Sequence, residues 1–404
     1  MIAWIPLASA ADDPVALVHT LEQPVAEVRG LAFREPVSVR VSTPREAVDA
    51  LRERLTGEWA ERLRLEGLAL RAFGLAGPDF SYTDALASSL ETQIGGFWEP
   101  YDQVLVVVAR DDPRFPLASV VQHELVHALQ DQTFDIGIKV DQTVRNDDVL
   151  LAFELLMEGD ATYTDLLATH PDLDALDLRA LAPGVWPESP VLVDAGPLPS
   201  SELESILVPY TLGAEHVQRL HRTGGWAAVN AAFTTPAAST EQILHPDRAS
   251  DLPMRIALDP GKAAGPGFHP VYESSVGELN LALAFRQIGR AAEAWDLAAG
   301  WDGDRYVILE DDAGAWCLVW RTVWDTEQDA AEFASAAEGW LRRADPHAVI
   351  DPVGTGVVAV VGAPPGRSAK LVKAAWKAPV VEARDVWDLL GSRPTEARRP
   401  STAP

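Results

Sequence analysis

The string VVQHELVHALQDQ, residues 120–132, constrains this chain more than any other feature. Its apolar residues recur at helical spacing, so we predict a helix over 117–132. Four helical positions of about 100° each return within about 40° of the same direction, so the imidazoles of His123 and His127 can bind one metal ion. Glu124 can reach a water on that ion without binding the ion itself. Apolar side chains on the reverse side predict a helix packed inside a domain: Val121, Leu125 and Leu129.

Because the chain has a single cysteine, the ligands of such a metal must be histidines and carboxylates. Cys317 is the single cysteine of the 404 residues, which excludes internal disulfides, multi-cysteine zinc sites and iron–sulfur clusters. Two imidazoles and one carboxylate fit zinc, because three protein ligands leave a fourth position for water, whose pKa the ion lowers toward about 7. The sequence therefore predicts one Zn²⁺ per chain.

A carboxylate on the following helix, predicted over 147–168, is the expected third ligand. Glu154 and Glu158 stand four residues apart and so lie on one helix face. They could form a solvated polar stripe, but their neighbours are almost all apolar, and a carboxylate in such a helix needs a partner. We predict Glu158 as the ligand and Glu154 as its alternative. Two more carboxylates in the same segment could replace the ligand or hydrogen-bond to one: Asp160 and Asp165.

The strings HELVH and EGDATYTD together resemble the gluzincin metallopeptidases, especially their aminopeptidase-N-like branch. The second zinc helix of that branch reads N-E-G-x-A-x-[aromatic]-x-E. This chain matches the pattern, with Met157 in place of the asparagine, at Glu158, Gly159, Ala161, Tyr163 and Asp165. The thermolysin-like register, with Glu154 as the ligand, fits less of the string. The resemblance covers residues 90–250 and implies a zincin-like fold, a zinc cofactor and peptidase activity.

A further string, VPYTLGA at residues 208–214, is similar to the V-P-Y-x-K-G segment of the same branch. The resemblance implies that the Tyr210 hydroxyl stabilises the oxyanion of the tetrahedral intermediate. An ordinary tyrosine that packs its ring at the start of a helix is the equal alternative. Catalysis would follow the zinc-hydrolase pattern, with Glu124 as the general base. Three histidines could take the place of Tyr210: His216, His221 and His245.

The chain departs from the aminopeptidase pattern at two places. Thirty residues separate His127 from Glu158, more than in that branch, which implies an inserted loop or a different subfamily. The free-amine motif G-x-M-E-N has only a partial counterpart in GFWE at residues 96–99, where the Met and Asn are missing. This segment is more simply explained as an edge strand along which an extended peptide pairs by its backbone. The expected substrate-binding residues of that strand are Gly95, Gly96 and Phe97.

Two classes of function are compatible with these residues. The first is a zinc peptidase that acts on a peptide or protein substrate. The second is a binding or scaffold protein that keeps the gluzincin fold and its zinc but cleaves nothing. Glu124 favours the enzyme, because a structural zinc site has no use for an uncoordinated base beside its water. Hydrolysis of a non-peptide amide or ester stays open, since nothing in the sequence defines the leaving group.

We expect an α+β protein with more than one domain. The predicted division is an N-terminal strand–helix segment at 1–75, a zincin-like catalytic domain of a small mixed sheet and helices at 76–255, a C-terminal α+β domain at 265–380 and a disordered tail at 385–404. The stretch 253–270, rich in Gly and Pro, marks the main boundary.

Local patterns predict the remaining elements. An extended stretch over 30–42 precedes TPRE at 43–46, which has the capping residue, proline and acidic first turn of a helix start. Two strands flank the turn at 99–102. Residues 133–146 and 171–201 are predicted loops. Helices are expected at 212–220, 225–233, 276–298, 326–343 and 368–376, and strands at 304–310, 315–323 and 356–362.

The charge balance limits the partners. The chain has 33 Lys and Arg against 60 Asp and Glu, a formal charge of −27, so it repels nucleic acids and anionic membrane surfaces. No stretch approaches the roughly 18 consecutive apolar residues of a spanning helix. Residues 2–11 end like a secretory signal, but no basic residue precedes them. This favours a cytoplasmic location over a secreted or cell-envelope one.

Overall fold

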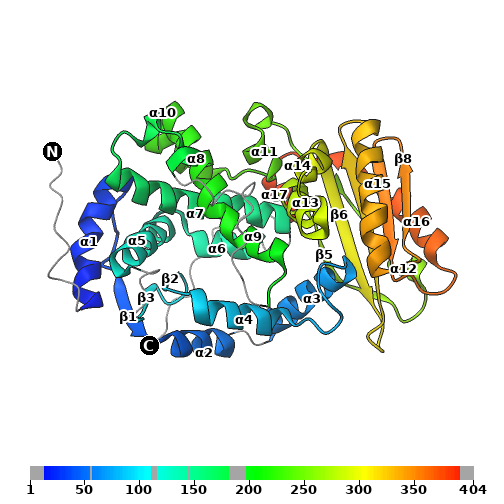
Figure 1. Ribbon diagram of the computed structural model, residues 1–404, viewed down its shortest axis with the longest axis horizontal. Helices are drawn as coiled ribbons and strands as arrows, with labels where there is room; N and C mark the ends of the chain where they lie inside the picture. The colour runs from blue at the N-terminus through cyan, green and yellow to red at the C-terminus, as the bar shows by residue number, and fades with distance from the viewer. Residues whose placement is uncertain (1–12, 55–56, 111–115, 144–145, 182–196, 392–404) are drawn as a thin grey trace. The chain divides into compact units, whose positions relative to one another are not determined.

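The structure is a computed structural model that describes residues 13–54, 57–110, 116–143, 146–181 and 197–391 (Figure 1). Helices and strands are mixed throughout, which confirms the predicted α+β class. Residues 2–11, whose end is similar to that of a secretory signal, lie outside the described residues. No helix in the described part of the chain combines the length and the apolar character needed to cross a membrane.

The chain divides into two compact units, each assembled from three segments. The first unit takes Met1–Gly67, Asp79–Gly137 and Glu154–Thr235. The second takes Leu68–Pro78, Ile138–Phe153 and Pro236–Pro404. Three helices therefore contribute residues to both units: α3 (Glu58–Ala72), α6 (Ile136–Thr143) and α7 (Asp147–Thr169).

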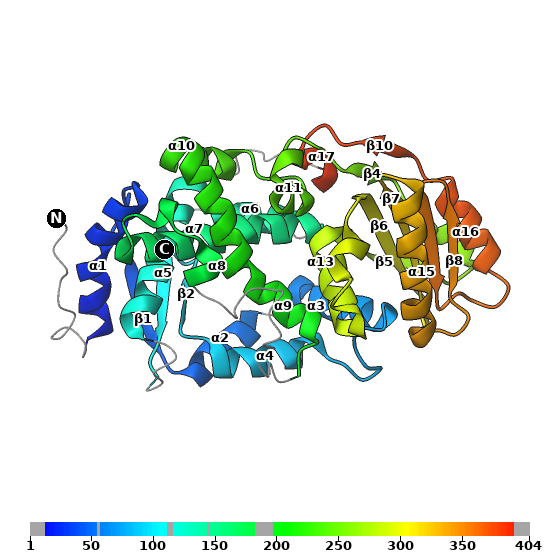
Figure 2. The same cartoon turned by 45° about the horizontal axis from the view of Figure 1, so that its top comes forward.

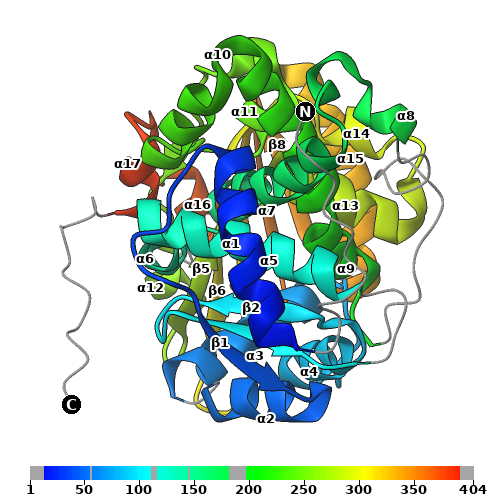
Figure 3. The same cartoon turned by 90° about the vertical axis from the view of Figure 1, so that its left-hand side faces the viewer.

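The first unit holds the elements from the N-terminal part of the chain up to α10 (Figures 1 and 3). Besides its shares of α3, α6 and α7, its elements are α1 (Pro14–Arg29), β1 (Ser38–Ser42), α2 (Pro44–Arg54), α4 (Tyr82–Gln93), β2 (Gly96–Glu99), β3 (Val104–Val108), α5 (Leu117–Phe134), η1 (Leu173–Ala175), α8 (Leu178–Leu181), α9 (Ser200–Val208), η2 (Pro209–Gly213) and α10 (Ala214–Thr234).

A small mixed sheet supports the first unit. Its strand order is β1-β3-β2, with β1 parallel and β2 antiparallel to the central strand. All residues of β3 are buried, as expected for a central strand of consecutive apolar residues. Helix α5 packs against β2 and β3, and α1 packs against α5 (Figure 3). The shared core includes Leu21, Val25, Leu105, Leu125 and Leu129.

Several predicted helix boundaries of the first unit are confirmed. Helix α2 begins at Pro44, where the hydroxyl of Thr43 accepts from the backbone N–H of Glu46 and the Glu46 carboxylate accepts from that of Thr43. Helices α5 and α7 and the two strands around residues 99–102 also lie where they were predicted. The two helices expected at 212–220 and 225–233 are confirmed as two helical stretches of α10, separated by a kink at Gly224 and Gly225, which have non-helical backbone angles.

The two predicted loops are partly wrong. Helix α6 occupies much of 133–146 although the stretch is polar overall, and its first residue, Ile136, is buried. Helix α5 ends just before it, at Phe134, and the next residue, Asp135, caps it with a φ of 54° in the left-handed region. Within 171–201 the structure has η1, α8 and the start of α9, while residues 182–196 lie outside the described residues.

The second unit holds the C-terminal elements (Figure 2). Besides its shares of α3, α6 and α7, these are α11 (Glu241–Leu244), η3 (Pro246–Arg248), β4 (Met254–Ile256), α12 (Gly261–Ala264), β5 (His269–Ser274), α13 (Gly277–Phe285), η4 (Arg286–Arg290), α14 (Ala294–Ala298), β6 (Trp301–Glu310), β7 (Trp316–Trp324), α15 (Glu327–Ala344), β8 (Val349–Val353), β9 (Gly356–Val361), α16 (Ser368–Trp376), β10 (Val380–Glu382) and α17 (Val386–Leu390).

A five-stranded antiparallel sheet forms the centre of this unit, in the order β5-β6-β7-β9-β8. Side chains alternate along β7: Cys317 and Val319 pack with Leu371 of α16, whereas Trp320 packs edge-on against Phe333 of α15. Helices α15 and α16 thus cover opposite faces of the sheet (Figures 1 and 2). The predicted strands β6, β7 and β9 and helices α15 and α16 are confirmed.

The tail predicted to be disordered from residue 385 is ordered at its start. Residues Val386–Leu390 form helix α17, because Asp385 caps it by accepting from the backbone N–H of Asp388 and Gly391 ends it with a φ of 73°. Val386 and Leu390 are buried in a small core with Val149. Residues 392–404 lie outside the described residues.

Candidate metal centre

Three side chains of the first unit converge in the arrangement that the sequence predicts for a metal. His123 and His127 lie on α5, and Glu158 lies on α7. The Nε2 atoms of the two histidines are 3.2 Å apart. The Oε2 of Glu158 lies 3.0 Å from the Nε2 of His123 and 3.4 Å from the Nε2 of His127. One ligand atom from each residue lies within 4.8 Å of the others, so the group could hold a metal ion. Glu154 is not part of it.

The charges of this group are those of a site that attracts a cation. Burial would raise the pKa of Glu158, but the two imidazoles outweigh burial and hold it well below its usual range. Burial would lower the pKa of both histidines, but Glu158 and, for His123, also Asp165 raise them. Two nitrogen lone pairs and a carboxylate that point at one another need a proton or a metal between them. This donor set fits Zn²⁺.

Glu124 lies beside this group but is not part of it. The residue is 9% exposed, and its Oε2 accepts from the backbone N–H of Trp98 at 2.9 Å. Burial raises the pKa of Glu124, while the two histidines oppose the rise. A carboxylate that is buried, fixed at one oxygen and inclined to hold a proton is a suitable general base.

The edge strand β2, which the sequence predicts to bind the substrate, lies next to Glu124. Gly96 and Phe97 belong to β2, and Gly95 directly precedes it. A Cβ on Gly96 would lie 2.9 Å from the Val120 side chain and 3.0 Å from the carbonyl oxygen of Val106. Only glycine therefore lets α5 approach the strand this closely.

Tyr210 stands over the candidate metal group from η2. Its ring stacks on His123, with the ring centroids 5.5 Å apart and the planes at 25°, and it is 40% exposed. Burial of the hydroxyl and the carboxylates of Glu158 and Glu124 raise its pKa well above the usual value. The hydroxyl therefore stays protonated and can donate a hydrogen bond.

Two glycines bring Tyr210 to this position. A Cβ on Gly159 would lie 2.2 Å from the backbone carbon of Gly213, and a Cβ on Gly213 would lie 2.2 Å from the carbonyl oxygen of Leu155. Helix α7 and the π-helical turn η2 touch through their backbones at this pair. Gly159 follows the candidate ligand Glu158 directly, so the contact places Tyr210 beside it.

The remaining candidate residues are placed as follows. The Asp165 Oδ2 is 3.4 Å from the Nδ1 of His123, the nitrogen that does not face the group. Asp160 is fully buried and pairs with Arg29 rather than with a candidate ligand. The histidines considered in place of Tyr210 have other neighbours: His221 contacts Asp174 and Tyr163, His245 contacts Glu278 in the second unit, and His216 contacts Arg219.

Sequence reasoning missed Gln130. Its side chain is fully buried, and its Oε1 lies 2.9 Å from the Nδ1 of His127. The available signal was an amide side chain three positions after His127, about one turn along the same helix, since a buried amide there needs partners. Sequence also could not show that Arg29, on α1, would meet Asp160.

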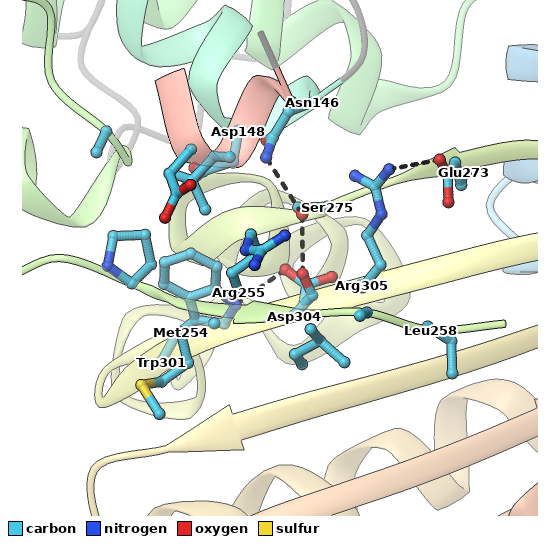
Figure 4. A pocket seen from close by; sticks show the side chains of 18 of the residues that line it. Asn146, Asp148, Met254, Arg255, Leu258, Glu273, Ser275, Trp301, Asp304 and Arg305 are labelled. Carbon is cyan, nitrogen blue, oxygen red and sulfur yellow. Dashed lines mark hydrogen bonds and ion pairs between the residues drawn. The ribbon is translucent and has the colours of Figure 1, made fainter. Parts of the chain in front are cut away.

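The second unit has a separate pocket of about 320 Å³ (Figure 4). Two buried carboxylates line it, Asp148 and Asp304. Both have structural partners. The Oδ1 of Asp148 accepts hydrogen bonds from the backbone N–H and the hydroxyl of Thr240. Asp304 accepts from four donors: the backbone N–H groups of Val276 and Gly277 and the indoles of Trp301 and Trp320. We therefore infer that the two carboxylates stabilise the fold of the second unit.

Asp148 predicts how stability depends on pH. Burial raises its pKa to about 8, against about 3.9 in an unfolded chain. The folded state therefore holds a proton that the unfolded state loses, so this contribution is full below about pH 4 and is lost as the pH rises to about 8. We expect the urea midpoint to fall between about pH 5 and 8.5. Asp148→Asn, which keeps an acceptor for Thr240, should flatten that slope.

The matched control for this measurement is Asp312→Asn, which removes an exposed carboxyl of the same unit. It should leave the slope unchanged. Equal slopes for Asp148→Asn and the wild type would contradict the role given to Asp148.

Comparison with known proteins finds a family model that matches part of the second unit. A model described as a domain of unknown function, DUF8575, matches residues 268–389. The comparisons with curated proteins and with solved structures find no match. The matched residues exclude the candidate metal centre, whose residues all precede position 268.

Proposed function

We propose that this chain is a zinc-dependent hydrolase that cleaves peptide bonds, with a zincin-like fold in the first unit. One observation carries the proposal: His123, His127 and Glu158 converge while a buried carboxylate, Glu124, stands beside them without joining the group. A structural zinc site is closed by four ligands, whereas a catalytic site keeps a position open and a base nearby.

The surroundings of this group support the proposal. The small sheet, with helix α5 against β2 and β3, gives a support for the two histidines and an edge strand beside them. The sequence resemblance to gluzincins concerns the same residues. A divergent member of that clan accounts for the longer separation of His127 and Glu158, in which α6 lies.

Each residue has a defined task in this proposal. His123, His127 and Glu158 would hold zinc, which when bound lowers the pKa of a water molecule and polarises a carbonyl group. Glu124 accepts a proton from the attacking water and passes it to the leaving amine. The Tyr210 hydroxyl donates a hydrogen bond to the oxygen that becomes negatively charged. The outer edge of β2, on the side away from β3, pairs with the backbone of an extended peptide.

Metal analysis combined with digestion of a peptide library tests the function. We expect one zinc per chain and cleavage that a chelator stops and added zinc restores. One zinc per chain without any cleavage would contradict the hydrolase and favour a zinc-containing binding protein. A chain that binds no zinc would contradict both.

Tyr210→Phe tests the oxyanion role. The variant keeps the ring that stacks on His123 but loses the hydroxyl. We expect kcat to fall by about 10²–10³-fold, the cost of one oxyanion donor, with KM and zinc content nearly unchanged. Tyr101→Phe, which changes an exposed tyrosine of the same unit, is the control and should retain full activity. An unchanged kcat for Tyr210→Phe would remove this residue from the mechanism.

A further inference from the structure

The second ring nitrogen of His127 has one hydrogen-bond partner among the described residues, and that partner determines the state of the ring. The Nε2 faces His123 and Glu158, whereas the Nδ1 lies 2.9 Å from the Oε1 of Gln130. A carbonyl oxygen can only accept a hydrogen bond, so the Nδ1 must carry the proton. In the neutral ring, the form that binds a metal, the Nε2 then has the lone pair and directs it at the group formed with His123 and Glu158.

This protonation state depends on the orientation of the Gln130 amide, and two acceptors fix it. The Gln130 Nε2 donates to the carbonyl oxygen of Met157 at 2.9 Å and to the Oδ2 of Asp160 at 2.9 Å. A flipped amide would place its oxygen against both of these acceptors and its NH₂ group against the Nδ1 of His127. Because Gln130 is fully buried, no water can compensate for such a flip.

Asp160 is in turn held by a buried cation. Its carboxylate lies 2.7 Å from the Nε of Arg29, and both side chains are fully buried. Arg29 ends helix α1, donates to Asn230 at 2.8 Å and lies over the ring of Trp226, 4.3 Å from the centroid. The ion pair holds the Asp160 carboxylate in place as an acceptor for Gln130, and a hydrogen bond to a carboxylate is stronger than one to a neutral oxygen.

We propose that Gln130 is a positioning residue that locks His127 in the tautomer protonated at Nδ1, and that Asp160 and Arg29 act through Gln130 to hold this lock. The inference rests on the proposed zinc site. It gives the N-terminal helix α1 a role in metal binding although none of its residues belongs to the group of candidate ligands. Outer hydrogen bonds of this kind commonly contribute about 10- to 100-fold to metal affinity.

Gln130→Met tests the lock, with Gln132→Met as its matched control. Gln132 lies on the same helix, is also buried and hydrogen-bonds to the backbone of Arg34 and Glu35, away from the candidate ligands. Both variants lose buried amide hydrogen bonds and should lose stability. Only Gln130→Met should also weaken zinc binding, by about 10- to 100-fold in competition with a chelator.

Asp160→Asn shows whether Asp160 acts through Gln130. On its own, Asp160→Asn should weaken zinc binding. In the double variant with Gln130→Met it should weaken zinc binding little further, because Gln130→Met has already removed the lock. Equal zinc affinity in Gln130→Met, Gln132→Met and the wild type would overturn the inference. Fully additive effects of Gln130→Met and Asp160→Asn would overturn the part assigned to Asp160.

A measurement on the wild type needs no variant to fold. In ¹⁵N-resolved NMR spectra of the zinc-loaded protein, His127 should show a protonated Nδ1 and a zinc-bound Nε2. Zinc on the Nδ1 would overturn the lock while leaving the hydrolase intact. A wild type that binds no zinc would instead overturn the proposed function itself, so the two failures are distinguishable.

Discussion

Glu124→Gln is expected to reduce peptide hydrolysis by about 10²–10⁴-fold while zinc stays bound. Glutamine has nearly the same shape, and its side-chain oxygen can still accept the hydrogen bond from the backbone N–H of Trp98 that now reaches Glu124 at 2.9 Å. What glutamine cannot do is accept a proton from the attacking water. Because Glu124 is not one of the three candidate ligands, the metal should be bound as in the wild type.

The measurement pairs kcat/KM on a peptide found in the library digestion with zinc content after gel filtration. Glu91→Gln, which changes an exposed carboxylate on α4, is the control and should behave like the wild type. Full activity in Glu124→Gln would refute the assignment of the general base. Loss of zinc together with activity would instead indicate that Glu124 supports metal binding.

The metal group could be predicted from sequence because its determinants are local. The four-residue spacing of His123 and His127 is a property of any helix, and the apolar segments around them identify α5 and α7 as buried helices. Spacing could not decide between Glu154 and Glu158, since both stand on one face. The resemblance of residues 158–165 to a second zinc helix favoured Glu158, and it is Glu158 that lies with the histidines in the structure.

The contacts that support the group could not be predicted, because they join distant segments. Arg29 and Asp160 are 131 positions apart, and nothing near either residue specifies the other. The strand β8 was missed for a different reason: it lies at the edge of its sheet, contains Pro352 and is partly exposed, so it lacks the alternation of a half-buried strand. The units themselves are assembled from separate segments, which a linear pattern does not reveal.

Glu158→Ala is expected to abolish zinc binding, and Glu154→Ala to preserve it. The two carboxylates lie one helical turn apart on α7, and only Glu158 belongs to the candidate ligand group, within 3.4 Å of both imidazoles. Removing a direct ligand should cost more than the roughly 10- to 100-fold expected for an outer hydrogen bond. In the metal-free state the variant also loses the negative charge that raises the pKa values of His123 and His127, so fewer protons should be bound there at neutral pH.

Thermal unfolding with and without zinc separates these effects. A ligand that binds only the folded state stabilises it by about 2.7 kcal/mol at 100 times its Kd. The Tm of the wild type and of Glu154→Ala should therefore rise when zinc is added, and that of Glu158→Ala should not. A rise in all three proteins would mean that zinc binds elsewhere. A rise in Glu158→Ala but not in Glu154→Ala would make Glu154 the ligand, as in the thermolysin-like register, and would require α7 to turn its other carboxylate toward the histidines.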